Sequence, residues 1–230
     1  MIRVLVDRDG RLREGEGHHL QVRRVEPGEA VDLRDGEGLI GSGTLRRTGK
    51  VWRLDVGATR RLAPSPRLVL AVGAGDRERF AWLVEKAVEL GVTAIVPLEC
   101  ERSAGVTTRV RSQHLDRLRR HALEAVKQSG AAWATRIEEP TSLDALVGQP
   151  SDGTRWLADA SGEPAPAMLG DAPMTVVVGP EGGLSPAERE RVLAAGFDAI
   201  RLATHTLRFE TAAVAAAAVA VAGRLRRGHG

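Results

Sequence analysis

Two short segments of the sequence carry polar groups in settings that suit chemistry. Residues 176–183 read Val-Val-Val-Gly-Pro-Glu-Gly-Gly, an apolar run that breaks into a glycine-rich turn with one carboxylate, Glu181. Paired glycines adopt backbone angles closed to other residues and let a ligand approach the main chain closely. Residues 207–212 read Leu-Arg-Phe-Glu-Thr-Ala, which places Arg208 and Glu210 just before an apolar helix. An arginine in this position can neutralise an anion formed in a reaction.

The residues around the first segment predict a strand, a turn and then a helix. Ser185 is a good N-cap, Pro186 suits the first helical position, and Glu188 completes a Ser-x-x-Glu capping box. Loops at the strand ends of an α/β sheet are the usual ligand sites, so the two segments together suggest one site. Two plainer interpretations stay open. The first segment can be only a tight turn, and the charged residues of the second can be an exposed ion pair.

The composition is that of a folded protein with a modest basic excess. The 230 residues can form one large domain or two smaller ones. The net charge of +3 comes from the first third of the chain, where residues 1–66 hold 13 basic and 10 acidic side chains. Arginine outnumbers lysine, which suits phosphate contacts, but the charge alone leaves nucleic-acid binding open. The single cysteine, Cys100, excludes an internal disulfide and fits a reducing cytoplasm.

Several other classes of site and location find no support in the sequence. The chain starts with charges where a signal peptide needs apolar residues. Its longest apolar run, 212–222, is shorter than the roughly 20 residues that span a bilayer. Gly73-x-Gly75 lacks the third glycine and the following helix of a dinucleotide fingerprint. The histidines and the cysteine show no ligand spacing, so we expect no metal site. We therefore expect a cytoplasmic protein.

The pattern of the sequence changes at Ala63-Pro64-Ser65-Pro66, which reads as a linker. Before it, short apolar runs separated by turn signals predict a small β-barrel, with strands over 2–6, 20–25, 30–33, 38–45 and 51–56. After it, strands and helices alternate, which favours a largely parallel sheet with helices on both faces. The predicted elements there are strands over 68–72, 94–98, 155–157, 176–178 and 200–203, and helices over 78–90, 115–126, 187–195 and 212–225.

The two chemistry-bearing segments resemble those of the RsmE-type 16S rRNA (uracil-N3) methyltransferases, of the knotted SPOUT class. Further fragments of this family occur in the same order over most of the chain, at 19–25, 85–91, 101–103 and 124–130. The sequence departs from the family pattern after Gly130, near Thr135 and at Phe209. These departures affect the RNA contacts more than the cofactor site.

The resemblance implies an α/β protein of two domains. Residues 1–64 are expected to form a small PUA-like β-barrel that binds RNA, and residues 67–230 a SPOUT methyltransferase domain with a deep trefoil knot. The implied cofactor is S-adenosylmethionine, held in the knot largely by backbone groups. The implied assembly is a homodimer with the site completed at its interface. The cofactor-binding residues carried over are Leu157, Gly179, Pro180, Glu181, Gly182, Gly183, Leu202, Ala203, Thr206 and Leu207.

The implied reaction moves a methyl group to N3 of one uridine in 16S rRNA, within the small ribosomal subunit. Neutral uracil N3 bears a proton that must leave, so we assign Glu181 or Glu210 to accept it and Arg208 to stabilise the uracilate. Two alternatives stay open. The chain can be a SPOUT methyltransferase of a ribose 2′-hydroxyl or a tRNA base, or a non-catalytic RNA-binding protein. The expected RNA contacts are Arg23, Arg24, Lys86, Arg102 and Gln128.

Overall fold

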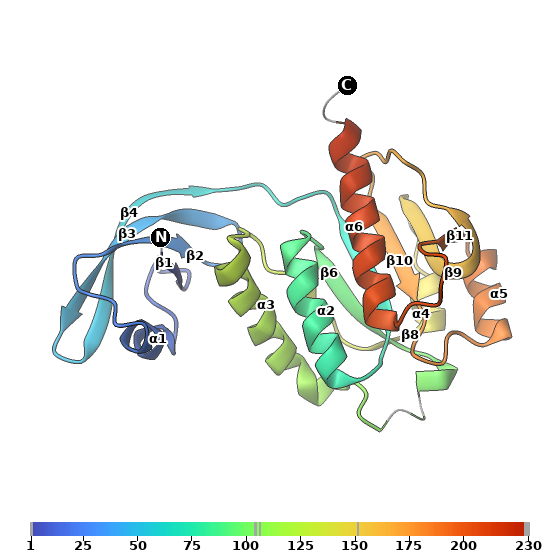
Figure 1. Ribbon diagram of the computed structural model, residues 1–230, viewed down its shortest axis with the longest axis horizontal. Helices are drawn as coiled ribbons and strands as arrows, with labels where there is room; N and C mark the ends of the chain where they lie inside the picture. The colour runs from blue at the N-terminus through green and yellow to red at the C-terminus, as the bar shows by residue number, and fades with distance from the viewer. Residues whose placement is uncertain (1, 104, 106, 151, 228–230) are drawn as a thin grey trace. The chain divides into compact units, whose positions relative to one another are not determined.

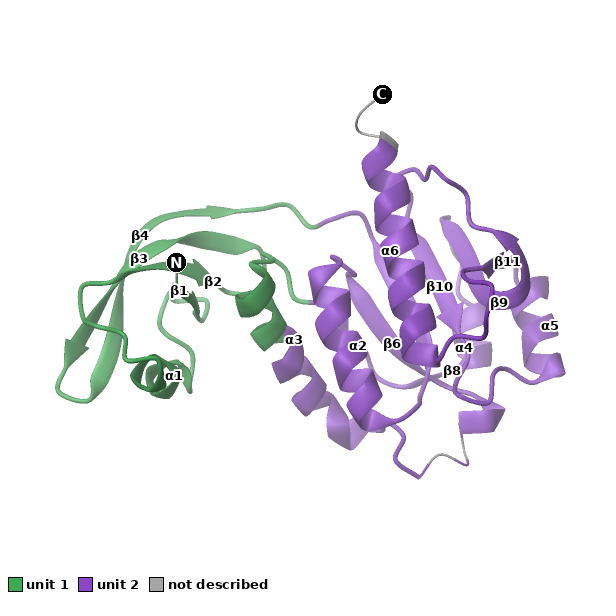
Figure 2. Cartoon of the chain, viewed as in Figure 1, with its two compact units in different colours: residues 1–64, 123–134 green, residues 65–122, 135–230 purple. Residues whose placement is uncertain are grey.

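A computed structural model describes residues 2–103, 105, 107–150 and 152–227, and Figure 1 shows its helices and strands. The chain divides into two units (Figure 2). One comprises the residues up to Pro64 together with Leu123–Ala134, and the other comprises Ser65–Ala122 together with the residues from Thr135 onward. The segment 123–134 thus belongs with the first 64 residues, a grouping that the alternating pattern of the sequence does not indicate.

A four-stranded sheet and a short helix make up most of the first unit. Their bounds are β1 Ile2–Leu5, α1 Glu16–Val22, β2 Ala30–Arg34, β3 Leu39–Thr48 and β4 Val51–Arg61. The strands follow the order β1-β2-β3-β4, in which β1 is parallel to β2 and the other pairs are antiparallel. Alternate strand residues such as Val31, Leu33 and Leu45 are buried in one core, which also takes Leu20 from the helix and Trp52.

The strand predicted over 20–25 is wrong, because its first residues lie in α1. The helix ends at Val22, and Arg24 adopts a left-handed turn conformation with φ of 54°. Leu20 and Val22 alternate with polar residues as in a strand, but Leu20 is buried whereas Val22 is 67% exposed. Burial of one helix face in the core of the sheet therefore outweighs the local alternation, which sequence patterning cannot weigh.

The second unit is built on a parallel sheet, as the sequence predicts. Its strands are β5 Leu68–Gly73, β6 Ala94–Glu99, β7 Arg136–Ile137, β8 Thr141–Ser142, β9 Thr154–Pro164, β10 Met174–Val178 and β11 Asp198–Arg201. They follow the order β11-β9-β10-β5-β6-β7, and β8 pairs with β6. β9 is much longer than predicted and lies close against β11. A Cβ atom at Gly162 of β9 would come within 2.4 Å of the Ala199 backbone, so glycine permits this approach.

Helices cover both faces of this sheet. The helical elements are α2 Arg77–Glu89, η1 Glu101–Ser103, η2 Ser112–His114, α3 Leu115–Ser129, α4 Leu143–Val147, α5 Pro186–Ala194 and α6 Phe209–Arg227. α2 and α6 lie side by side on one face (Figure 1). α4 and α5 pack against the other, on strand residues such as Ala71, Leu98 and Val177. None of the helices within the described ranges is long and apolar enough to cross a membrane.

Candidate functional site

A cavity of about 310 Å³, called the first cavity below, opens at the carboxyl end of β10 and beside residues 157–160 in the middle of β9. Its walls come from these parts of the two strands, from the glycine-rich turn after β10, and from the loop between β11 and α6. Parallel strands end at the same edge of the sheet, so two segments that are distant in sequence line one concave site there. The structure thus brings the Gly-Pro-Glu-Gly-Gly segment and the segment before Arg208 to one place.

The glycines of the turn after β10 are required by close backbone contacts. A Cβ atom at Gly179 would lie 3.0 Å from the backbone nitrogen of Leu184, and Gly183 has φ of +69°, a left-handed conformation that favours glycine. The Gly183 N–H donates to the Pro180 carbonyl over 2.8 Å and closes the turn. Gly73 at the end of β5 permits the same approach from the other side, because a Cβ there would lie 2.4 Å from the Pro180 nitrogen.

The capping box predicted for α5 is present and reaches further than its own helix. Glu188 accepts a hydrogen bond from the Ser185 N–H over 2.8 Å, and the Ser185 hydroxyl accepts one from the Glu188 N–H. The other carboxylate oxygen of Glu188 accepts from the Glu101 N–H, also over 2.8 Å. This side chain is only 2% exposed. A buried carboxylate therefore joins the start of α5 to the turn that follows β6.

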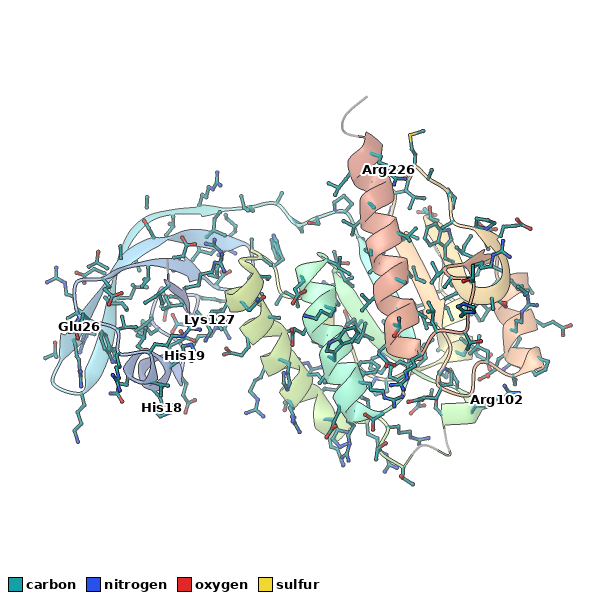
Figure 3. The ribbon with its side chains drawn as sticks, viewed as in Figure 1. His18, His19, Glu26, Arg102, Lys127 and Arg226 are labelled. Atoms are coloured by element: carbon teal, nitrogen blue, oxygen red, sulfur yellow. The ribbon has the colours of Figure 1, made fainter. Side chains whose placement is uncertain are left out.

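Two further contacts hold the glycine-rich turn from the β5–β6 side. The guanidinium of Arg102, labelled in Figure 3, donates to the Gly182 carbonyl over 2.6 Å. One carboxylate oxygen of Glu181 accepts from the Asp76 N–H over 2.9 Å, at the N-cap of α2. Arg102 is thus engaged with the turn in this structure, whereas the sequence assigned it to RNA.

An ion pair that sequence reasoning missed lines the first cavity. Arg189 of α5 donates to Asp159 of β9 over 2.5 Å, and the Ser161 N–H donates to the same carboxylate over 2.8 Å. Burial would raise the pKa of Asp159, but the hydrogen bonds from Ser161 and Arg189 outweigh it and hold that pKa below its ordinary range. No local motif marks such a pair, because its partners lie on separate elements.

The predicted cofactor-binding residues mostly lie on the first cavity. Those that line it are Leu157, Gly179, Pro180, Glu181, Gly183, Leu202, Ala203, Thr206 and Leu207. Gly182 is exposed and is not among the lining residues. Sequence reasoning missed Phe209, which lines the cavity and packs on Phe80 with ring centroids 6.4 Å apart. It also missed Ile200, whereas His205 of the lining lies in the 202–207 loop that the family resemblance indicates.

The three predicted catalytic residues have different surroundings. Glu181 lines the first cavity, whereas Arg208 and Glu210 do not. Arg208 is exposed at the start of α6. Glu210 is 7% exposed, and its Oε2 atom has no hydrogen-bond partner among the described residues.

The remaining predicted RNA contacts are scattered over both units. Arg23 and Arg24 are exposed just after α1. Gln128 lies in the part of α3 that belongs to the first unit, and its carbonyl accepts a hydrogen bond from Arg3 over 2.8 Å. Lys86 on α2 contacts Glu85 and Glu89 over 2.8 Å each, and these hydrogen bonds raise its pKa. Within the described ranges, no group of three or more potential metal-binding side chains occurs.

Comparison with known proteins identifies the family. A family model for an RNA methyltransferase domain matches residues 63–221, and one for an RNA methyltransferase PUA domain matches residues 12–50. The chain is 32% identical over 213 residues to ribosomal RNA small subunit methyltransferase E of Aquifex aeolicus. The aligned region covers 88% of this chain and 90% of that protein. The chain belongs to this family of RNA methyltransferases.

Solved structures of similar proteins share the whole fold. A ribosomal RNA small subunit methyltransferase E from Neisseria gonorrhoeae, crystallised with S-adenosyl methionine bound, is 27% identical with a TM-score of 0.83, over 95% of both chains. A probable rRNA-methyltransferase from Porphyromonas gingivalis is 26% identical with a TM-score of 0.85, over 99% of this chain and all of that one. The first cavity therefore lies in a fold that this chain shares with methyltransferases.

Proposed function

We propose that this protein transfers the methyl group of S-adenosylmethionine to N3 of a specific uridine in 16S rRNA of the small ribosomal subunit. The observation that carries the proposal is the glycine-walled first cavity at the carboxyl edge of the sheet, in a chain of the methyltransferase E family. The bound cofactor of the Neisseria gonorrhoeae relative supports the choice of cofactor.

The lining of the first cavity fits S-adenosylmethionine. Leu157, Val178 and Ile200 offer apolar surface to a flat heterocycle. Among the described residues, the backbone N–H groups of 203–207 donate to no protein acceptor and are free to hold polar groups of a ligand. The absence of side chains at Gly179 and Gly183 brings the main chain within reach. When bound, S-adenosylmethionine supplies an electrophilic methyl group on its sulfonium sulfur.

The acceptor atom needs a base, and the geometry favours Glu181 over Glu210. Glu181 lines the first cavity and uses one carboxylate oxygen on the Asp76 N–H, which fixes its position and leaves the other oxygen for the N3 proton. Glu210 is buried and lines no part of that cavity. We assign Arg208, which is exposed next to Leu207 of the lining, to neutralise the uracilate that remains after the proton has left.

The remaining features of the proposal rest on family membership. Residues 1–64 act as a PUA-like β-barrel domain that binds RNA, with Arg23 and Arg24 on phosphates. Residues 67–230 act as the SPOUT methyltransferase domain, in which the cofactor lies in a deep trefoil knot. The active protein is a cytoplasmic homodimer. The PUA-domain match over residues 12–50 and the whole-chain structural similarity support this organisation.

Transfer of labelled methyl from S-adenosylmethionine to unmethylated small ribosomal subunits tests the proposal, with the modified nucleoside identified by mass. Label in 3-methyluridine is the expected result. Label at a ribose hydroxyl or in tRNA would instead assign the chain to another methyltransferase branch, and cofactor binding without transfer would indicate a non-catalytic RNA-binding protein. Glu181→Gln should lower kcat by at least about 100-fold, as expected for loss of a general base. Glu210→Gln is the matched control and should keep turnover.

A further inference from the structure

A second cavity of about 490 Å³ opens at the same edge of the sheet, over the neighbouring strands β5 and β6. Ala74 follows β5, Glu99 ends β6, and Cys100 and Ser103 lie in the turn after it. The opposite wall is the segment 109–112, which is held in place because the Val110 N–H donates to the Gly75 carbonyl over 3.0 Å. Its volume lies in the usual range of small-ligand pockets.

The second cavity combines a basic rim with one buried polar group that lacks a strong partner. Arg109 and Arg111 both line it, against a single acidic residue, Glu99. The Ser103 hydroxyl is buried, with the residue only 1% exposed. Among the described residues its oxygen has no hydrogen-bond partner apart from the thiol of Cys100, which is a weak one. A buried hydroxyl in this state indicates room for a polar ligand group.

A short chain of backbone contacts connects the two cavities and begins at Glu181 of the first one. Its carboxylate accepts from the Asp76 N–H, and Asp76 directly follows Gly75, whose carbonyl holds Val110 of the second cavity. Gly73 contacts Pro180 of the first cavity, and Ala74 lines the second. The carboxylate proposed as the base thus lines the cofactor cavity and is linked through Gly75 and Asp76 to the adjacent basic one.

From these contacts we infer that the second cavity receives the target nucleotide of the RNA substrate, an inference that rests on the proposed function. A base in a folded RNA must leave its stack before its ring can be modified, and it then needs an enclosing pocket. Apolar atoms of Ala74, Val110 and Pro140 cover the faces of the base, and the Ser103 hydroxyl bonds its polar edge. Arg111, which is exposed at the rim, binds the adjoining phosphate.

Two cavity variants, one conservative variant (Arg111→Lys) and one control test the inference. Arg111→Ala removes the phosphate contact and Ser103→Ala removes only the buried hydroxyl. Arg136→Ala is the control. Arg136 is also an exposed arginine, but it pairs with Ala94 at the start of β6 and so lies at the other end of the strands from the second cavity. The measurements are kcat/KM for unmethylated small subunits at several salt concentrations and the Kd for S-adenosylmethionine by calorimetry.

Arg111→Ala should lower kcat/KM about 10- to 100-fold, the effect of losing a charged hydrogen bond. It should also reduce the slope of log kcat/KM against log salt by about one, and Arg111→Lys should restore that slope. Ser103→Ala should lower kcat/KM about three- to tenfold with the slope unchanged. In all variants the Kd for S-adenosylmethionine stays at the wild-type value, and Arg136→Ala behaves as wild type.

Wild-type kcat/KM in both cavity variants would overturn the inference while leaving the proposed function standing. A parallel loss of S-adenosylmethionine affinity would also overturn it, because the second cavity would then act through the first. If the wild-type protein transfers no methyl group to small subunits, the proposed function fails and the inference fails with it.

Discussion

Replacing Glu188 with alanine should destabilise the second unit well beyond the usual effect of a single helix residue. The carboxylate is 2% exposed and accepts backbone hydrogen bonds from Ser185 and Glu101, both 2.8 Å long. A hydrogen bond to a charged group contributes about 1.5–3 kcal/mol. Taking the low end for each bond, because water can reach the exposed Glu101 turn, gives a loss of about 3 kcal/mol in the free energy of unfolding.

Urea unfolding followed by circular dichroism measures this loss. Glu190→Ala provides the matched control, because Glu190 is an exposed glutamate on the same helix and its loss should change stability by no more than about 0.5 kcal/mol. Glu188→Gln should fall between the two variants, since the amide keeps one acceptor oxygen but turns a donor toward the other N–H.

Glu188→Ala should also weaken the binding of S-adenosylmethionine. Glu188 joins the turn after β6 to the start of α5, and the glycine-rich turn of the first cavity leads directly into that helix. If Glu188→Ala unfolds no more easily than Glu190→Ala, the two backbone contacts do not anchor these loops and the reasoning is refuted.

Three other predictions follow from single residues. Arg224→Met should lower the free energy of unfolding by about 2 kcal/mol, because the guanidinium donates to the carbonyls of Pro66, Arg67 and Ala172. An unchanged midpoint of urea unfolding would contradict this. Burial, followed by the nearby Glu188 charge, raises the pKa of Cys100 to about 12, so at pH 8 the folded protein should react with a thiol reagent far more slowly than the urea-unfolded chain. Asp159 has a folded pKa below its ordinary range, so its stabilising contribution is present at neutral pH and is lost as the pH falls through the folded value. The stability gap between wild type and Asp159→Asn should therefore be largest near pH 7 and shrink below about pH 4, and a gap that stays constant into acid would refute the assignment.

The sequence by itself determined the features that depend on neighbouring residues. The capping box of Ser185 and Glu188, the glycine-rich turn at 179–183 and the alternation of strands and helices after the linker each involve residues a few positions apart. Their hydrogen bonds and periodicity are local, so they leave a direct trace in the order of residues. The family resemblance rests on the same local segments, read in order.

Only the tertiary structure decided which residues complete the site. Arg102 meets the Gly182 carbonyl, Glu188 meets Glu101, and Glu181 meets Asp76, across separations of 80, 87 and 105 positions. The conformation of residues 20–22 was likewise decided by burial against strands elsewhere in the chain. Contacts of this kind depend on which strand ends share an edge of the sheet, and that order, β9-β10-β5-β6, is a property of the folded topology rather than of any stretch of sequence.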